Sequence, residues 1–226
     1  MSEDTKVDLK GIYDDDYFIN RMSNDPKRMS SFQLEKIFIY NYISSGRLID
    51  FGCSTGEFIQ SLKWNGETYG IEISDSAAKI AKSNSIKFDH DLSDVVDYYD
   101  VIIFRGTIQH LDDPFKYLKL AYRSLKPGGY VFFLATPNTE SIYYRLWRTL
   151  PMLDPVMNFW IPGSQELNNI MKNFGFTHIE SRFPYLHSPY KFFFMDHFLF
   201  LIKLFSRRKS IKFPFWGSVM EICFKK

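Results

Sequence analysis

The sequence predicts an α/β fold in which helices cover both faces of a mostly parallel sheet. Apolar runs that suit buried strands alternate with amphipathic helical patterns along residues 47–135. A glycine-containing turn joins the first of these strands directly to a helix. The run Tyr99–Phe104 is almost continuously apolar, as expected of a strand that is covered on both faces. Ligands of such sheets bind beyond the carboxyl ends of the strands.

Turn and capping residues place the elements of the first half. The spacing of apolar residues predicts a helix over Tyr17–Ile43 that ends near residues 44–46. A second helix follows the glycine-containing turn at Glu57, and Ser74 is expected to cap a third over Asp75–Lys82. The predicted strands are Arg47–Phe51, Thr68–Ile73, Ile86–Phe88 and Tyr99–Phe104.

The same signals place the elements of the second half. Pro114 fits the first turn of a helix, and Lys126-Pro127-Gly128-Gly129 ends that helix. Another helix is expected over Ser164–Asn173. Residues 138–162 and 183–216 lack a regular pattern, and we expect them to be insertions. The remaining strands are predicted at Tyr130–Ala135, Thr177–Arg182 and Gly217–Phe224.

Length and composition narrow the class of protein. A chain of 226 residues suits one domain with a substantial core. Its two cysteines, Cys53 and Cys223, provide neither a disulfide framework nor a metal cluster. Residues 1–16 are polar and acidic, unlike a secretory signal, so a cytoplasmic location is expected. Residues 182–226 hold nine Lys and Arg against two acidic residues, which favours either an anionic partner or a solvated face.

The turn within residues 48–56 carries the strongest functional signal. Gly52 and Gly56 allow backbone N–H groups to approach a ligand without a Cβ in the way. The helix that begins behind them favours negative charge. Asp50, just before the turn, suits a cationic amine. The pattern therefore predicts a zwitterionic, nucleotide-like ligand.

Two other interpretations of this turn fit less well. A dinucleotide site needs G-x-G-x-x-G, which the spacing Gly52-x-Ser54-x-Gly56 does not match. The same residues satisfy G-x-S-x-G, which would make Ser54 the nucleophile of a serine hydrolase, with a later histidine as its base. A nucleophile of that kind follows several strands, whereas only one convincing helix and one strand come before Ser54.

Taken in order, the motifs resemble those of the class I S-adenosylmethionine-dependent methyltransferases. The segment Asp50-Phe51-Gly52-Cys53-Ser54-Thr55-Gly56 is similar to their D-x-G-x-G-x-G loop, with Ser54 in place of the middle glycine. Glu72 ends the second strand, 22 residues after Asp50. Leu125-Lys126-Pro127-Gly128-Gly129 is similar to the family's turn before strand five. The resemblance covers roughly residues 40–182.

This resemblance implies a Rossmann-like sheet of seven strands, the last one antiparallel, and S-adenosylmethionine as the cofactor. Glu72 is then expected to accept hydrogen bonds from the ribose hydroxyls. Asp91-Leu92, or Asp89 as second choice, is expected to face the adenine. Arg105 is expected at the cofactor's carboxylate or an acidic acceptor, or in a structural ion pair. The expected cofactor-binding residues are Asp50, Gly52, Cys53, Ser54, Gly56, Glu72, Ile73, Asp91, Leu92 and Arg105.

Methyl transfer by direct displacement needs orientation and exclusion of water, and a hydroxyl acceptor gains from a general base. His110 lies in a segment similar to the Leu-Glu-His stretch that precedes Asp-Pro in many small-molecule members of the family. His187 lies in the second insertion, where acceptors usually bind. We expect one of these two histidines to act on the acceptor. No histidine–carboxylate spacing suits a metal, so none is expected.

The resemblance also suggests how the domain is divided. Residues 1–45 are expected to form a helical cap, residues 46–136 a cofactor-binding half and residues 137–226 an acceptor-side half. The expected acceptor is the hydroxyl of a sugar or nucleotide-linked sugar in glycan assembly. A quinone-like or lipid-linked acceptor at a membrane surface is the alternative. A module that binds the cofactor without catalysis is a third, and nucleic acid is not expected as a partner.

The apolar segment Tyr190–Phe205 is followed directly by Arg207-Arg208-Lys209. It is too short and too charged to span a bilayer. An apolar helix beside a basic cluster can lie on an anionic membrane. The same segment could instead be a lid over the acceptor or the contact surface of a homodimer.

Overall fold

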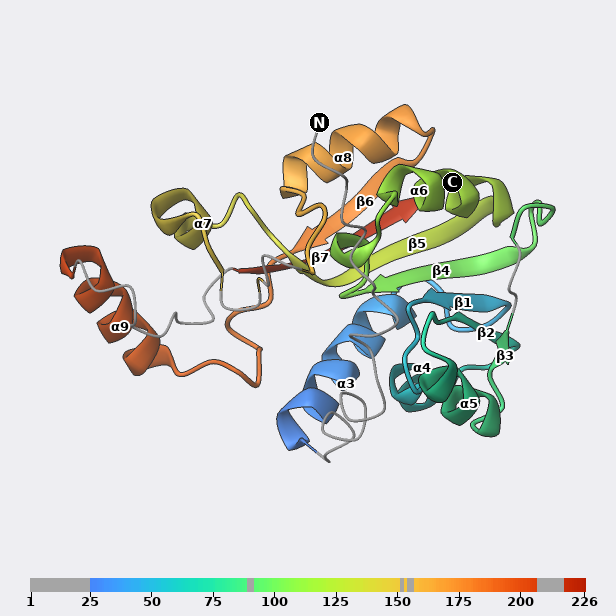
Figure 1. Ribbon diagram of the computed structural model, residues 1–226, viewed down its shortest axis with the longest axis horizontal. Helices are drawn as coiled ribbons and strands as arrows, with labels where there is room; N and C mark the ends of the chain where they lie inside the picture. The colour runs from blue at the N-terminus through green and yellow to red at the C-terminus, as the bar shows by residue number, and fades with distance from the viewer. Residues whose placement is uncertain (1–24, 89–91, 151–152, 154–156, 207–217) are drawn as a thin grey trace, which may run out of the picture.

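The computed structural model describes residues 25–88, 92–150, 153, 157–206 and 218–226. Within them one sheet has the strand order β3-β2-β1-β4-β5-β7-β6 (Figure 1). Its strands are β1 (Leu48–Phe51), β2 (Thr68–Ile71), β3 (Lys87–Phe88), β4 (Tyr99–Arg105), β5 (Leu125–Pro137), β6 (Thr177–Arg182) and β7 (Val219–Lys225). The helices are α3 (Pro26–Tyr40), α4 (Glu57–Leu62), α5 (Asp75–Ser83), the short 3-10 helix η1 (Ile108–His110), α6 (Pro114–Ser124), α7 (Ile142–Trp147), α8 (Ser164–Asn173) and α9 (Phe193–Phe205).

Strand directions confirm the predicted fold class. The pairs among β1 to β5 are all parallel, whereas β7 is antiparallel to both β5 and β6. The carboxyl ends of β1, β2 and β4 therefore meet at one edge of the sheet. Residues that follow these strands are brought together there.

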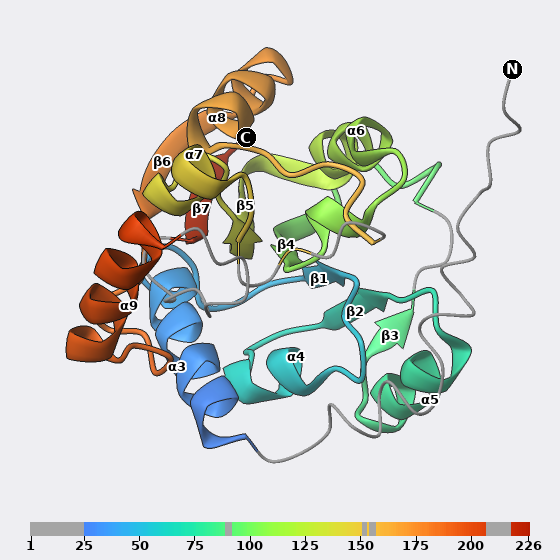
Figure 2. The same cartoon turned by 60° about the vertical axis from the view of Figure 1, so that its left-hand side comes forward.

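Helices cover the two faces of the sheet (Figures 1 and 2). On one face, α6 and α8 contribute Leu118 and Met171 to a buried cluster in which Phe104 stacks on Phe133. On the other face, α3, α4 and α5 pack on a second cluster. There Phe38 of α3 meets Phe132 of β5 edge to face, with ring centroids 5.7 Å apart.

The start of α3 corrects one prediction. Asp25 is extended and its side chain accepts a hydrogen bond from the N–H of Lys27, which makes Asp25 the N-cap. Pro26 occupies the first helical position, where its missing N–H costs nothing. A single helix from Tyr17 is therefore wrong, because the helix begins at Pro26. Residues 17–24 lie outside the described residues.

The second half contains more regular structure than the sequence predicted. Residues 138–162 were expected to be irregular, yet Ile142–Trp147 form α7. Its N-cap Ser141 accepts a hydrogen bond from the N–H of Tyr144. Tyr143 packs against Phe200 of α9, with ring centroids 5.6 Å apart. A contact made across 57 residues stabilises a helix that local pattern alone does not reveal.

The predicted helix over Ser164–Asn173 and the predicted strand over Thr177–Arg182 are confirmed with the same bounds. Strand β5 begins at Leu125 rather than at Tyr130, because Leu125 already pairs with Tyr99 before a shift of register. None of the described helices combines the length and the hydropathy needed to cross a bilayer.

Candidate cofactor-binding site

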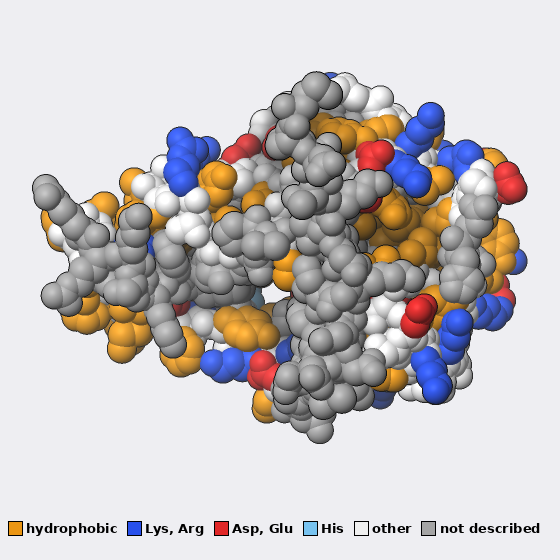
Figure 3. All heavy atoms as spheres, in the orientation of Figure 1, with side chains coloured by type: hydrophobic (Ala, Val, Ile, Leu, Met, Phe, Trp, Pro, Cys, Tyr) orange, Lys and Arg blue, Asp and Glu red, His pale blue; other side chains and the backbone are white. Residues whose placement is uncertain are grey.

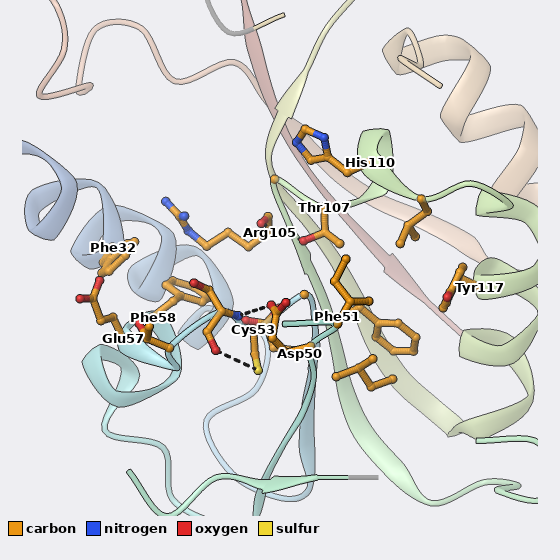
Figure 4. Close-up of a pocket in the computed structure, with 18 of the residues that line it drawn as sticks. Phe32, Asp50, Phe51, Cys53, Glu57, Phe58, Arg105, Thr107, His110 and Tyr117 are labelled. Atoms are coloured by element: carbon orange, nitrogen blue, oxygen red, sulfur yellow. Dashed lines mark hydrogen bonds between the residues drawn. The ribbon is translucent and has the colours of Figure 1, made fainter. Parts of the chain in front are cut away.

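A cavity opens at the carboxyl edge of the sheet, between the glycine turn after β1 and the end of β4 (Figure 4). Asp50 lies in its centre, with Phe32 and Phe58 on the side of α3 and α4. Tyr117 of α6 lies on the opposite side. Other lining residues are Arg28, Phe51, Gly52, Cys53, Ser54, Thr55, Glu57, Ile71, Glu72, Ile73, Arg105, Gly106, Thr107, His110 and Leu111.

The turn after β1 has a backbone that only small residues adopt easily. Gly52, Ser54 and Gly56 all have positive φ, at 76°, 52° and 81°. A Cβ on Gly52 would lie 2.6 Å from the side chain of Thr107, and one on Gly56 would lie 2.1 Å from Ile86. Gly52 therefore lets the turn approach the end of β4. Gly56 does not line the cavity, and its role is the close packing of α4 on Ile86.

Strand β2 holds this turn in place. The N–H groups of Gly52 and Cys53 both donate to the carbonyl of Ile71, at 2.7 and 3.0 Å. A Cβ on Gly70 would lie 2.5 Å from Cys53 Sγ, so the thiol occupies the space that glycine leaves. Burial raises the pKa of the Cys53 thiol, which keeps it protonated. Cys53 thus lines the cavity while it packs against β2.

Asp50 is a buried carboxylate at the centre of the cavity. It is 2% exposed, and its Oδ1 has no hydrogen-bond partner among the described residues. Burial raises its pKa well above the ordinary value, and the positive charge of Arg105 opposes that shift. A buried acceptor without a donor is costly in free energy. An ammonium group in the cavity would satisfy it.

Glu72 is held rigidly by the backbone. Its Oε2 accepts the N–H of Ser54 and its Oε1 accepts the N–H of Ser74, both at 2.9 Å. Burial raises its pKa, and these backbone hydrogen bonds oppose the shift. Each oxygen keeps a further lone pair. The carboxylate can therefore accept two more hydrogen bonds, as a pair of adjacent hydroxyls requires.

Arg105 is paired with Glu35 of α3. Its Nε and Nη2 donate to the two oxygens of Glu35, at 2.6 and 3.1 Å. The guanidinium also lies over the rings of Phe32 and Phe58, 4.5 and 5.1 Å from their centroids. Of the two roles expected for Arg105, the ion pair is present. Arg105 also lines the cavity, and a contact of Nη1 with a ligand carboxylate stays a prediction.

The ring of His110 is oriented by the backbone. Its Nδ1 lies 2.8 Å from the carbonyl oxygen of Met157. A carbonyl only accepts, so Nδ1 carries the proton and Nε2 has the lone pair in the neutral ring. The side-chain amide of Gln109 lies 3.3 Å from Nε2. His110 therefore lines the cavity with Nδ1 bonded to the backbone and Nε2 within hydrogen-bond distance of the Gln109 amide.

Comparison with known proteins identifies the family. Residues 18–181 match a protein-family model described as "Methyltransferase domain". The chain belongs to this family. Together with its fold, this places it among the class I S-adenosylmethionine-dependent methyltransferases, whose cofactor is S-adenosylmethionine. The resemblance noted from the motifs is thus confirmed.

Curated relatives are similar to this methyltransferase over part of their sequences. Ubiquinone biosynthesis O-methyltransferase of Hydrogenovibrio crunogenus is 27% identical over 118 residues, which cover 47% of this chain and 49% of the relative. The protein of that name from Thiobacillus denitrificans is 28% identical over 116 residues, covering 46% and 50%. The chain therefore spans about half the length of the curated relatives it matches.

Solved structures resemble the methyltransferase over nearly all of its length. A methyltransferase of Archaeoglobus fulgidus superposes with a TM-score of 0.64 at 19% identity, covering 94% of this chain and all of that one (100%). A methyltransferase of Thermotoga maritima, described as a possible histamine N-methyltransferase, gives 0.60 at 22% identity, covering 93% and 98%. At such identities the likeness shows the fold alone.

The residues of the methyltransferase cavity fit S-adenosylmethionine. Asp50 would offer its unpartnered oxygen to the amino group and Glu72 would offer two acceptors to the ribose, while the glycine turn leaves room for the backbone to approach. When bound, the cofactor would supply a methyl group on a sulfonium centre, an electrophile for a nucleophilic atom of the acceptor. His110 lines the same cavity, and its role as general base stays a prediction.

Three expected site residues, Gly56, Leu92 and His187, do not line this cavity. Leu92 is buried in the core cluster under α6 and does not line the cavity. His187 is exposed and lines a separate, second cavity. Asp91, like the alternative Asp89, lies outside the described residues. In the described part of the chain, no group of three or more His, Cys, Asp or Glu residues is placed to hold a metal ion.

Several lining residues were not predicted from the sequence. Thr107 packs against Gly52, and its position two residues after the end of β4 is a signal that could have revealed it. Phe32 and Tyr117 come from helices that fold over the cavity from two sides. Arg28 of α3 and Glu57 of α4 form an ion pair of 3.1 Å beside it. No local signal marks these helix residues, since their position depends on tertiary packing.

Proposed function

We propose that this methyltransferase transfers a methyl group from S-adenosylmethionine to a hydroxyl of a quinone-like phenolic ring that carries a lipid-like chain. The reaction takes place at the surface of an anionic bilayer. The observation that carries the proposal is the outward-facing apolar side of α9. A cytoplasmic location remains a prediction consistent with it.

The names of the relatives favour this acceptor over the sugar expected from the sequence. Two relatives from different bacteria are ubiquinone biosynthesis O-methyltransferases, and neither name refers to a sugar. Their similarity covers about half of each protein, so it supports the type of reaction more strongly than the acceptor. Helix α9 supports the lipid-like chain independently.

Helix α9 buries its charged residues and exposes its apolar residues. The surface helix of a typical soluble protein does the reverse. Its charged residues Asp196 and Lys203 are each only 4% exposed, whereas Phe194 and Phe205 are 87% and 84% exposed. Asp196 accepts a hydrogen bond of 2.9 Å from the hydroxyl of Tyr185. The helix thus contacts the protein by its polar side and presents its aromatic side outwards.

The exposed side of α9 forms a continuous stripe. Phe194, Phe198, Leu201 and Phe205 follow one another at helical spacing, and all are exposed. In Figure 3, hydrophobic side chains gather at the end of the molecule that α9 forms. Apolar surface of this size on one helix marks an interaction site.

The charges around α9 favour a lipid surface over a second copy of the chain. Arg145 of the neighbouring α7 and Arg148 at its end are exposed, and so are the apolar side chains of Ile142 and Leu146. The sequence continues after α9 with Arg207-Arg208-Lys209. Two copies that met through this surface would bring their cations together, which is unfavourable. Anionic lipids attract the cations while their acyl chains accept the aromatic rings.

Methyl transfer is tested by turnover. The purified chain is incubated with S-adenosylmethionine carrying a labelled methyl group and with a catechol that bears one isoprenyl chain. We expect a labelled methyl ether to form. His110→Gln should lower kcat by about 100-fold with unchanged cofactor affinity, because a general base is lost. His178→Gln, on an exposed part of β6, is the matched control.

The same assay decides whether His110 or His187 is the general base. If His187→Gln lowers kcat and His110→Gln does not, His187 is the base. Calorimetric binding of S-adenosylmethionine without turnover on this catechol or on sugar acceptors would favour a non-catalytic module. Turnover on a nucleotide-linked sugar alone would restore the glycan hypothesis.

Lipid binding is tested by sedimentation with vesicles. Wild-type protein should bind vesicles of phosphatidylglycerol and phosphatidylcholine more tightly than vesicles of phosphatidylcholine alone. The double variant Phe194→Ser/Phe198→Ser should weaken binding at least about tenfold, because two large apolar side chains no longer enter the interface. Val96→Ser removes an exposed apolar side chain away from α9 and serves as control. Unchanged vesicle binding, or a dimer that the double variant dissociates, would contradict the lipid surface.

A further inference from the structure

A second cavity lies under α9. Its volume is about 520 Å³, which is within the range of small-molecule sites. Leu34 of α3 lines one side, and Phe193 and His197 of α9 line another. The loop after β6 contributes Phe183 and neighbouring residues. Figure 2 shows α9 beside α3, so the cavity lies between the body of the protein and the helix with the apolar outer face.

One buried carboxylate, Glu221, lines this cavity. Glu221 of β7 is 5% exposed, and none of the described residues makes a hydrogen bond or an ion pair with it. Burial raises its pKa to about 7; the nearby negative charges of Glu35 and Glu180 add to the shift, and Arg182 and Arg105 oppose it. A ligand with a hydroxyl group would donate a hydrogen bond to this carboxylate.

The second cavity is close to the methionine end of the cofactor site. The ion pair of Arg105 and Glu35 influences the pKa of Asp50 in the first cavity and that of Glu221 in the second. Arg105 lines the first cavity, and Leu34, next to Glu35 on α3, lines the second. The two cavities are therefore close to the same ion pair.

We propose that the second cavity binds the methyl acceptor, with Glu221 hydrogen-bonded to one oxygen of a ring that carries two oxygens. The other oxygen points towards the first cavity, and the apolar substituent lies against Phe183 and Phe193 in the direction of α9. This inference rests on the proposed function, because it takes the acceptor to be a phenolic ring with an apolar chain. The chemical class recognised is a dihydric phenol, which keeps one hydroxyl for methyl transfer.

Binding is measured by calorimetry with the isoprenyl catechol and S-adenosylhomocysteine-saturated protein. Glu221→Gln should weaken the binding of the catechol about tenfold, because a hydrogen bond to a carboxylate is replaced by a weaker one. Leu34→Trp should weaken it further by filling the cavity. Ile37→Trp adds the same ring to an exposed position of α3 and should change nothing. S-adenosylhomocysteine should bind all four proteins equally.

The same variants separate this inference from the proposed function. Methyl transfer with an unchanged KM for the catechol in both Glu221→Gln and Leu34→Trp would overturn the cavity while the function stands. Catechol binding that these variants weaken, without methyl transfer by the wild type, would support the cavity and overturn the function. Loss of S-adenosylhomocysteine binding in Glu221→Gln would show that Glu221 belongs to the cofactor site, and would also overturn the inference.

Discussion

Arg105 at the end of β4 and Glu35 of α3 form a two-pronged ion pair, with N–O distances of 2.6 and 3.1 Å. Glu35 is almost completely buried, at 2% exposure. The pair joins the helix over the sheet to the strand that ends at the cofactor cavity. A buried ion pair of this kind fixes geometry more than it adds stability.

Removal of one partner should therefore be costly. Glu35→Leu leaves the guanidinium of Arg105 without its carboxylate, and we expect the free energy of unfolding to fall by about 3 kcal/mol. The double variant Glu35→Leu/Arg105→Met should regain most of that loss, because no unpaired charge remains. Urea denaturation measures both values. A double variant as unstable as the single one would show that the pair itself supplies the stability.

The same double variant tests the second role proposed for Arg105. We expect it to bind S-adenosylmethionine about tenfold more weakly, since Nη1 can no longer reach the carboxylate of the cofactor. Calorimetry measures the affinity, and wild-type affinity would leave Arg105 with the ion pair alone.

Asp50 should couple cofactor binding to pH. Burial raises the pKa of Asp50 in the free protein, so a proton must leave before its carboxylate can pair with the amino group. The affinity for S-adenosylmethionine should therefore rise with pH, with release of a proton on binding. Asp50→Asn should abolish this dependence and weaken binding about 30-fold, the value of a charged hydrogen bond. Calorimetry in buffers of different ionisation enthalpy counts the protons, and no release would refute the pairing.

Ser54 distinguishes methyl transfer from ester hydrolysis. Its φ of 52° is strained for a residue with a Cβ, so Ser54→Gly should raise the free energy of unfolding by about 1 kcal/mol. Ser54→Ala should keep methyl transfer within about threefold of wild type, because the hydroxyl is not a nucleophile; hydrolysis lost in Ser54→Ala would instead support the hydrolase.

Glu221 should make stability depend on pH. Its pKa is about 7 in the folded protein against an ordinary value of 4.5, so the folded state binds more protons between these values. Stability then falls as pH rises through this window. The difference in unfolding free energy between Glu221→Gln and wild type should move by about 3 kcal/mol in favour of the variant from pH 4 to pH 8. If urea denaturation gives the same pH dependence of the unfolding free energy for Glu221→Gln and wild type, the raised pKa is contradicted.

Most of the fold follows from local signals in the sequence. Ser74 caps α5 as predicted, and the glycine turn joins β1 to α4. Helix α7 escaped prediction because it has six residues, several of them aromatic, and depends on the contact of Tyr143 with Phe200. The division into a cap and two halves remains a prediction.

The site could be predicted from the sequence where the spacing of a motif determines where its residues lie. Asp50 and Glu72 were found by their spacing, and both line the cavity. The Arg105–Glu35 pair joins residues 70 positions apart. Glu221 reaches the second cavity only because β7 pairs with β6. Such relationships arise from packing, and no periodicity reveals them.

The thiol of Cys53, tucked against Gly70, provides a built-in reporter of local opening. Because it is buried and protonated, an alkylating reagent reaches it only when the turn detaches from β2. Its alkylation rate, followed by mass spectrometry of the peptide that contains it, therefore measures how often the turn opens. A bound nucleoside should lower that rate.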